Sequence, residues 1–158
     1  MSYQNLTTGR YSETGRAYSL TMVTDRRIPH FNDFAKARYL INEMRTVHDS
    51  GLLESLAWGL MPDHLHWLLV VNETELSEVV RIFKGKSSFD FKKSFHHNGA
   101  FWQRGFYDHA LRKEEDLRAA ARYIVANPLR AGLVETIGEY SHWVLPGWFI
   151  KIRRRAWL

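Results

Sequence analysis

The sequence of 158 residues has no cysteine, and it also lacks long apolar runs. Without thiols the chain cannot form a disulfide framework, a cysteine zinc finger or a thiol nucleophile, so a bound metal would need nitrogen and oxygen ligands. The longest apolar run near the middle spans only residues 67–71, whereas a membrane helix needs about 20 residues. The polar residues 1–5 lack the apolar stretch of a signal peptide. We therefore expect a soluble protein of the cytoplasm with no membrane partner.

The rest of the composition is typical of one globular domain. Hydrophobic residues make up 45% of the chain and aromatic residues 14%, which is too apolar for an intrinsically disordered protein. No linker rich in Gly, Ser or Pro, internal repeat or low-complexity segment divides the sequence. We expect a single domain over residues 1–158, with residues 1–16 as a polar arm and residues 135–158 as a basic, tryptophan-rich tail.

The net charge of +5 is concentrated in two segments. Residues 81–93 carry a net charge of +4, residues 151–158 carry another +4, and the rest of the chain therefore has a net charge of −3. Localised positive charge favours a polyanionic partner such as nucleic acid, because it neutralises phosphates. A solvated helix face followed by a basic tail would produce the same pattern, so charge alone leaves both interpretations open.

The spacing of apolar residues predicts an α+β domain. β-formers and turn residues predict strands at residues 17–24, 53–60, 65–71 and 101–111. Apolar residues three and four apart predict helices at residues 31–50 and 76–95, and a third helix that begins at residue 114 and ends at Pro128. Gly85 is a position at which the second helix could break. This order predicts a ferredoxin-like fold, a four-stranded antiparallel sheet with helices on one face.

His64 and His66 are the first candidates for chemistry. Side chains alternate along a strand, so the two imidazoles share one face while Leu65 points to the other. Two imidazoles can bind one divalent cation, but they leave its coordination incomplete. The alternative is that they are two ordinary histidines at the end of a strand.

Tyr123 and Asn127 form a second pair, one turn apart on the last predicted helix. The amide oxygen of Asn127 could be a third metal ligand, and the phenol of Tyr123 could be a nucleophile if a cation or base lies nearby. Alternatively, Tyr123 is a core aromatic and Asn127 simply ends the helix before Pro128. If this helix crosses the sheet near His64, the two pairs form one site, in which a metal polarises a phosphoryl oxygen while Tyr123 attacks phosphorus.

Three sequence blocks resemble one enzyme family. Residues 61–68 (MPDHLHWL) look like the His-hydrophobic-His strand of the single-tyrosine HUH transposases and nucleases. Residues 101–112 (FWQRGFYDHALR) and 123–134 (YIVANPLRAGLV) resemble two further blocks of its REP-associated branch, the REP-associated tyrosine transposases of bacteria. The three blocks occur in the same order as in that family.

The resemblance implies a ferredoxin-like HUH fold and a transposase function in DNA recombination. It implies that His64, His66 and Asn127 hold Mg²⁺ or Mn²⁺, and that Tyr123 attacks single-stranded DNA. The product would be a 5′-phosphotyrosine link with a free 3′-hydroxyl, which can be reversed to rejoin strands. The substrate would be the hairpin of a repetitive extragenic palindrome (REP) with a guide tetranucleotide at its foot, which implies association with the nucleoid.

Basic and aromatic residues supply candidate DNA contacts, as phosphate ligands or stacking platforms. These candidates are Arg10, Arg16, Arg26, Arg27, Arg81, Lys84, Lys86, Lys92, Lys93, Trp102, Arg104, His109, Arg130, Arg153, Arg154 and Arg155. Exposed charges with no function are the alternative for the lysines and arginines, and a place in the core is the alternative for Trp102. We expect the tail to pack on the body near the DNA path, although a mobile arm ordered by DNA is also open.

Two other functions remain open from the sequence. One is a non-catalytic module with the same fold that binds single-stranded DNA or has a regulatory role. The other is a metal-dependent phosphoesterase in which His64 and His66 activate water. The basic segments suit all three functions, whereas only the transposase needs Tyr123 within reach of the metal. A monomer is the expected state, with a dimer left open.

Overall fold

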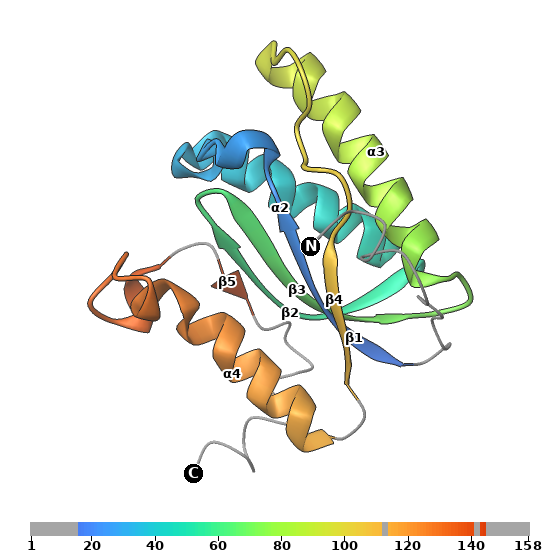
Figure 1. The fold of residues 1–158 in the computed structure, drawn as a ribbon, viewed down its shortest axis with the longest axis vertical. Helices are drawn as coiled ribbons and strands as arrows, with labels where there is room; N and C mark the ends of the chain where they lie inside the picture. The colour runs from blue at the N-terminus through green and yellow to red at the C-terminus, as the bar shows by residue number, and fades with distance from the viewer. Residues whose placement is uncertain (1–15, 112–113, 141–142, 145–158) are drawn as a thin grey trace.

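Figure 1 shows the computed structural model, which describes residues 16–111, 114–140 and 143–144. The strands are β1 (Ala17–Val23), β2 (Leu53–Met61), β3 (His64–Val71), β4 (Tyr107–Leu111) and β5 (Trp143–Val144). The helices are α2 (Phe34–Asp49), α3 (Leu76–Phe95) and α4 (Glu114–Arg130), with short 3₁₀-helices η1 (Asp25–Arg27), η2 (His30–Asn32) and η3 (Ile137–Glu139). The predicted arm, apart from Arg16, and most of the predicted tail lie outside these residues.

All strands belong to one antiparallel sheet with the order β4-β1-β3-β2-β5. The first four strands have the predicted ferredoxin-like arrangement, and the predicted α+β class is confirmed. β5 adds two residues beside β2 that the sequence did not predict. The register places His66 of β3 between Thr21 of β1 and Gly59 of β2, so these three residues form one row across the sheet.

One face of the sheet is covered by α2 and α3. Apolar residues of both helices, such as Leu40 and Phe83, share a buried cluster with Leu20 of β1 and with Trp67 and Leu69 of β3. Leu69 and Trp67 lie two residues apart, as expected for side chains on one face of a strand. This layer is the main hydrophobic core.

The prediction that the helices lie on one face is wrong for α4, which covers the opposite face (Figure 1). Its residues Ala121, Ile124 and Val125 share a second buried cluster with residues that include Leu68 of β3 and Leu111 of β4. The physical reason is that β3 is apolar on both faces from residue 67 to residue 71, so both faces of the sheet must be shielded from water. Successive residues of β3 then pack alternately against the layer of α2 and α3 and against α4.

Capping and backbone conformation explain where α2 begins and ends. The helix starts at Phe34 rather than Phe31, because the Asp33 side chain accepts hydrogen bonds from the first free N–H groups. Gly51 follows the helix with φ of +81°, a left-handed conformation that glycine adopts at little cost. Gly85 does not interrupt α3, which is continuous through it.

The predicted strand at residues 101–111 is shorter in the structure. Only Tyr107–Leu111 pairs with β1 as a strand, and the segment before it contributes a single bridge between Trp102 and Thr24. Phe101, Trp102 and Phe106 are all buried in this segment, which breaks the alternation of a half-exposed strand. The three aromatic side chains therefore pack into the core from a loop rather than from a strand.

α4 continues through Pro128 to Arg130, although we predicted that it would end at Pro128. Proline removes the hydrogen bond that residue 128 would donate to the carbonyl of residue 124, and its ring crowds that carbonyl. The Ile124 carbonyl lies instead against Gly59, which has no side chain to clash with it. In the part of the chain that the structure describes, no helix combines the length and apolar character needed to cross a membrane.

Candidate active site

The hairpin turn between β2 and β3 places the two candidate histidines. β3 begins at His64 directly after the turn at residues 62–63, so His64 and His66 project together from the face that α4 covers. Their Nε2 atoms lie 3.1 Å apart, and both side chains are half-buried. The expected convergence of the two imidazoles is present.

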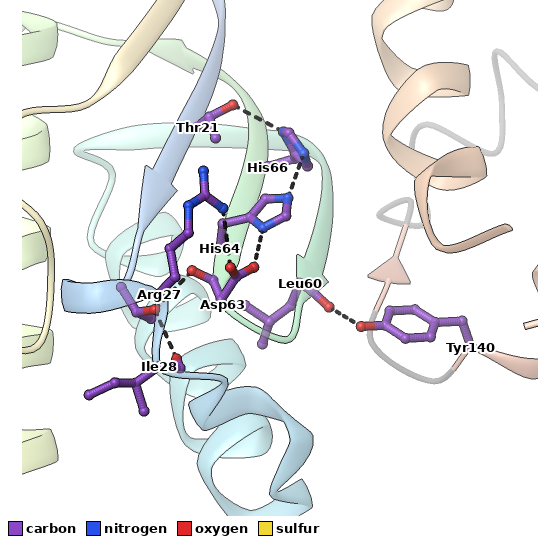
Figure 2. Close-up of polar contacts among 9 residues, drawn as sticks. Thr21, Arg27, Ile28, Leu60, Asp63, His64, His66 and Tyr140 are labelled. Atoms are coloured by element: carbon purple, nitrogen blue, oxygen red, sulfur yellow. Dashed lines mark hydrogen bonds and ion pairs between the residues drawn. The ribbon is translucent and has the colours of Figure 1, made fainter. Parts of the chain in front are cut away.

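A continuous line of polar contacts holds the two rings, as Figure 2 shows. The Thr21 hydroxyl lies 3.0 Å from His66 Nδ1, and His64 Nδ1 lies 2.6 Å from Asp63 Oδ1. The other Asp63 oxygen accepts a hydrogen bond of 3.1 Å from Arg27 Nη1. Because His64 Nδ1 faces a carboxylate, it carries a hydrogen, so the neutral form of this ring has its Nε2 lone pair directed at His66.

Burial and neighbouring charges determine the protonation states of His66 and Asp63. Burial and, to a smaller extent, the charge of the adjacent His64 together lower the pKa of His66 to about 4, so His66 is uncharged at neutral pH. Burial alone would raise the pKa of Asp63, but hydrogen bonds and charge from His64 and Arg27 hold it below its usual value. An uncharged imidazole supported by an ionised carboxylate on its neighbour is the state that can bind a cation.

Tyr123 lies beside this pair on α4. Its ring is nearly perpendicular to that of His66, with 6.1 Å between the ring centroids. The Arg130 guanidinium carbon lies 4.6 Å from the centroid of the Tyr123 ring and places a positive charge next to it. Since 47% of Tyr123 is exposed, it is not the core aromatic of the alternative interpretation, and a large substrate can reach it.

Gly59 explains how α4 comes so close to the histidines. A β-carbon on Gly59 would lie 3.1 Å from the carbonyl oxygen of Ile124 and 3.2 Å from its Cγ2 atom. Gly59 pairs with His66 across the sheet, and Ile124 follows Tyr123 in α4. The missing side chain thus brings the tyrosine and histidine elements together, which the sequence did not reveal because it depends on strand register.

The donor set at this site can accept a divalent cation. Two nitrogen ligands at adjacent octahedral positions with bonds of about 2.1 Å are separated by about 3 Å, close to the distance between the two Nε2 atoms. The same distance suits an N–H···N hydrogen bond, so one arrangement serves both states. Across the described ranges, no group of three or more His, Cys, Asp or Glu side chains could hold a metal, so further ligands would have to be other oxygens.

Asn127 has the position, but not a contact, expected of a third ligand. It lies one turn beyond Tyr123 in α4 and is half-buried. Among the residues that the structure describes, its side chain makes no hydrogen bond to His64 or His66. Its role as a ligand stays a prediction.

Several residues that were predicted to contact DNA form ion pairs with carboxylates of the protein instead. Arg27 binds Asp63, and Arg26 lies 3.5 Å from the carboxylate of the residue before it. Arg81 forms two hydrogen bonds to a glutamate within its own helix. Lys86 contacts one carboxylate on α2 and one on α3. A phosphate would have to compete with these exposed ion pairs, which are individually weak.

Lys84 binds the backbone of the loop that leads into β4. Its ammonium group donates hydrogen bonds of 2.6 and 2.7 Å to the carbonyl oxygens of Gln103 and Gly105. Burial lowers the pKa of Lys84 to about 8. The position is therefore structural, rather than that of a free surface charge along a DNA strand.

Trp102 does not lie where a DNA base could stack. It is only 7% exposed, and its indole N–H donates a hydrogen bond to the buried Ser87 hydroxyl. The core alternative is therefore correct for Trp102, because its large apolar area and its single donor are both satisfied inside the protein.

The remaining predicted contacts divide by position. Lys92, Lys93, Arg104 and His109 are exposed, and Arg16 is half-buried at the start of β1. Arg10, Arg153, Arg154 and Arg155 lie outside the described residues. His109 lies opposite Ser19 of β1 on the face that α4 only partly covers.

Tyr107 is a surface aromatic that the sequence analysis did not select. It pairs with Thr21 and shares a face with Leu111, whose side chain packs in the second cluster against α4. Its ring is 52% exposed, two residues from His109. Only the strand register shows that Tyr107 continues the row of His66 and Thr21 to the edge of the sheet, so the sequence offered no signal for it.

Comparisons with known proteins match most of this chain. The family model "Transposase IS200 like" matches residues 13–127. A Haemophilus influenzae protein, assigned by name to the REP-associated tyrosine transposases, is 28% identical over 144 aligned residues, and the alignment covers 81% of this chain and 78% of the relative. An Escherichia coli REP-associated tyrosine transposase is 30% identical over 89 residues, 53% of this chain and 49% of the relative.

A solved structure shares the fold. The REP-associated tyrosine transposase bound to a REP hairpin has a TM-score of 0.72 and 24% identity, over 85% of this chain and 79% of that one. The family match covers most of the chain and includes His64, His66, Tyr123 and Asn127. This chain therefore belongs to the IS200-like transposases, and its relatives confirm the resemblance to the REP-associated tyrosine transposases.

Proposed function

We propose that this transposase cleaves and rejoins single-stranded DNA through a covalent bond to Tyr123. The main support for this proposal is the position of Tyr123. The centroid of its ring lies 6.1 Å from that of His66, beside the facing Nε2 atoms of the two histidines. A phosphate that reaches the imidazole pair would therefore also lie near the phenol. The half-exposed ring leaves room for the DNA strand to approach.

The reaction exchanges one phosphodiester bond for another. The Tyr123 hydroxyl transfers its proton to solvent, and its oxygen attacks phosphorus and forms a bond to it. The bond from phosphorus to the 3′-oxygen breaks, and that oxygen leaves as a 3′-hydroxyl after it gains a proton. Arg130, over the ring of Tyr123, stabilises the negative charge on the phenol oxygen. Attack by a 3′-hydroxyl on the phosphotyrosine reverses the step and rejoins a strand.

His64, His66 and the amide oxygen of Asn127 would hold Mg²⁺ or Mn²⁺. Such a cation supplies charge that polarises the phosphoryl oxygen. The support for it is the 3.1 Å separation of the Nε2 atoms and the hydrogen bonds at both Nδ1 atoms, which orient the rings as metal-bound histidines are usually oriented.

The substrate that fits best is DNA with a REP-type hairpin next to a single strand. The relative with the shared fold is bound to such a hairpin, and curated relatives are named for REP elements. The exposed face around Tyr107 and His109 continues from the histidine pair to the sheet edge, where unpaired bases could stack. This DNA is the partner that we propose, in the nucleoid.

The test is a cleavage assay on a labelled REP-type hairpin oligonucleotide with Mg²⁺ or Mn²⁺. Wild type should give a protein–DNA adduct that survives denaturing electrophoresis, and Tyr123→Phe should give neither adduct nor cut. Tyr39→Phe is the matched control. It removes the phenol hydroxyl that Tyr39 of α2 donates to the Ser87 carbonyl of α3, and both helices lie on the other face of the sheet.

Two results would reject the proposal in different ways. Cleavage by Tyr123→Phe without an adduct would assign the attack to water, as in a metal-dependent phosphoesterase. Hairpin binding by wild type without a cut in either metal would assign a non-catalytic DNA-binding function. Cleavage that survives the double change of His64 and His66 to Ala would remove the metal from the proposal.

A further inference from the structure

A cavity on the other side of the sheet has chemistry that the cleavage site does not use. It encloses about 210 Å³ between α2 and β2, and Arg38, Arg45 and His48 line it from the helix. These residues lie seven and three positions apart, which places them on one helix face. Trp58 and Ser55 line it from β2, on the face opposite to the one that carries His64 and His66.

An irregularity in β2 builds the strand side of this cavity. The pairing of β2 with β3 shifts register between Ser55 and Ala57, which inserts one extra residue. Ser55 and Trp58 consequently share a face, although they are three positions apart and regular alternation would put them on opposite faces. Such bulges are common where a strand presents side chains to a functional site.

The two arginines lack partners among the residues that the structure describes. In contrast to Arg27, Arg81 and Lys86, neither Arg38 nor Arg45 forms a hydrogen bond or ion pair with any residue in the described ranges. No acidic side chain is among those that line the cavity in this part of the chain. Two unpaired guanidinium groups at one opening attract an anion, and their planar donor sets match the oxygens of phosphate.

His48 adds a directed donor to this positive charge. Its Nδ1 atom accepts a hydrogen bond of 3.1 Å from the backbone N–H of Ser55. The hydrogen of the neutral ring must therefore be on Nε2, where it is available to donate. The apolar floor, formed by Ile41, Met44 and Trp58, suits the sugar or base next to a phosphate rather than a free inorganic ion.

We propose that the cavity of Arg38, Arg45 and His48 binds a phosphate group carried by a nucleotide. It lies on the α2 layer, so this phosphate is not the one that Tyr123 attacks. Two sources share this chemistry: a diester phosphate of the DNA away from the cut, and a free mononucleotide. The first source rests on the proposed function, since it requires that this protein bind DNA, and the second does not.

The first measurement is the salt dependence of binding to a labelled REP-type hairpin oligonucleotide. It uses Tyr123→Phe as the background, so that cleavage does not affect the result. Adding Arg38→Gln and Arg45→Gln should weaken binding about tenfold at low salt and reduce the slope of log Kd against log salt by about 1.4 to 1.8, the amount expected for two lost phosphate contacts. Lys36→Gln is the control, because it removes one charge from α2 outside the cavity.

The second measurement uses the wild-type chain and separates the two sources. The amide signal of Ser55 in a ¹H–¹⁵N spectrum reports on His48, to which this N–H donates. It should move when the hairpin is added and stay fixed with dTMP if the source is DNA. It should move with dTMP if a free nucleotide binds, and inorganic phosphate should then bind more weakly than dTMP.

The outcomes distinguish this cavity from the cleavage site. If the Ser55 signal stays fixed with both the hairpin and dTMP, and the salt slope of the double variant equals that of its background, the cavity proposal is overturned whether or not the protein cuts DNA. If the wild type makes no cut but dTMP moves the signal, the cavity proposal stands and the cleavage proposal fails.

Discussion

The carbonyl oxygen of Ile124 lies 3.1 Å from the ideal β-carbon position of Gly59, which is closer than an ordinary contact of a β-carbon. A Gly59→Ala substitution should therefore push α4 away from β2 and move Tyr123 relative to His66. We expect a loss of about 1–3 kcal/mol in the free energy of unfolding, typical of an overpacked contact. We also expect a loss of DNA cleavage, because even a shift of a few tenths of an ångström at this contact displaces Tyr123 from His66.

Gly85→Ala provides the matched control for Gly59→Ala. Gly85 lies in α3 with open space around its β-carbon position. Alanine should stabilise the helix by roughly 0.5–1 kcal/mol and leave cleavage unchanged. Chemical denaturation and single-turnover cleavage measure both effects, and equal cleavage by the two variants would contradict the role given to Gly59.

Asp63→Asn should weaken the binding of Mn²⁺. The change removes the charge that fixes His64 Nδ1 and Arg27, while the side chain keeps its size. Loss of such a supporting contact typically lowers metal affinity about 10–100-fold. Titration calorimetry with Mn²⁺ measures this loss, and Asp25→Asn, which affects only the nearby exposed Arg26, should bind as the wild type does. Equal affinities in all three proteins would contradict the role of Asp63.

Tyr107→Ala should reduce the affinity for the single-stranded part of the substrate. The ring is half-exposed on β4 in the row of Thr21 and His66, and stacking of one base on an aromatic ring contributes about 1–3 kcal/mol. Fluorescence anisotropy should show a loss of about 5–150-fold for the alanine variant. Tyr107→Phe keeps the stacking surface and should bind normally, so an equal loss in both variants would indicate a role for the hydroxyl instead.

Lys84 should make the stability of the protein rise at alkaline pH. Its pKa is lowered to about 8 in the fold, below the ordinary value of 10.5, so the unfolded chain binds more protons between these values. The difference in unfolding free energy between wild type and Lys84→Met should therefore increase in favour of the wild type from about pH 8 to pH 10. Denaturation series at fixed pH values measure this difference.

Lys86 has the opposite shift and provides the contrast. Hydrogen bonds and charge from Asp90 and Glu43 raise its pKa above the ordinary value. The stability that Lys86 contributes is thus fully present below pH 10.5 and is lost only above it. The difference between wild type and Lys86→Met should stay flat from pH 8 to pH 10, and a rise like that of Lys84 would contradict both assignments.

The local part of the fold could be predicted from the sequence. The periodicity of α2 and α3 and the turn before His64 depend on residues that are neighbours along the chain. The alternation of strand side chains was enough to place His64 and His66 on one face, before any tertiary contact was known.

The remainder depends on contacts between distant segments. The side of the sheet that α4 covers, the register that aligns Tyr107 with Thr21, and the close approach at Gly59 all require the folded arrangement. Trp102 illustrates the same limit, because an aromatic residue among basic ones suits a DNA surface and a core plug equally well. Only the buried hydrogen bond to Ser87 decides between them.

The contact between Thr21 and His66 affects how quickly a metal ion could bind to the imidazole pair and leave it. A hydroxyl group can donate or accept, and a rotation of its hydrogen alone switches the two roles. Thr21 can therefore support His66 with the ring hydrogen on either nitrogen, while the 3.0 Å contact and both rings stay in place. A cation bound by both Nε2 atoms would require only that the His66 hydrogen shift to Nδ1, with almost no reorganisation of heavy atoms, so we would expect its loading and release to be rapid and reversible.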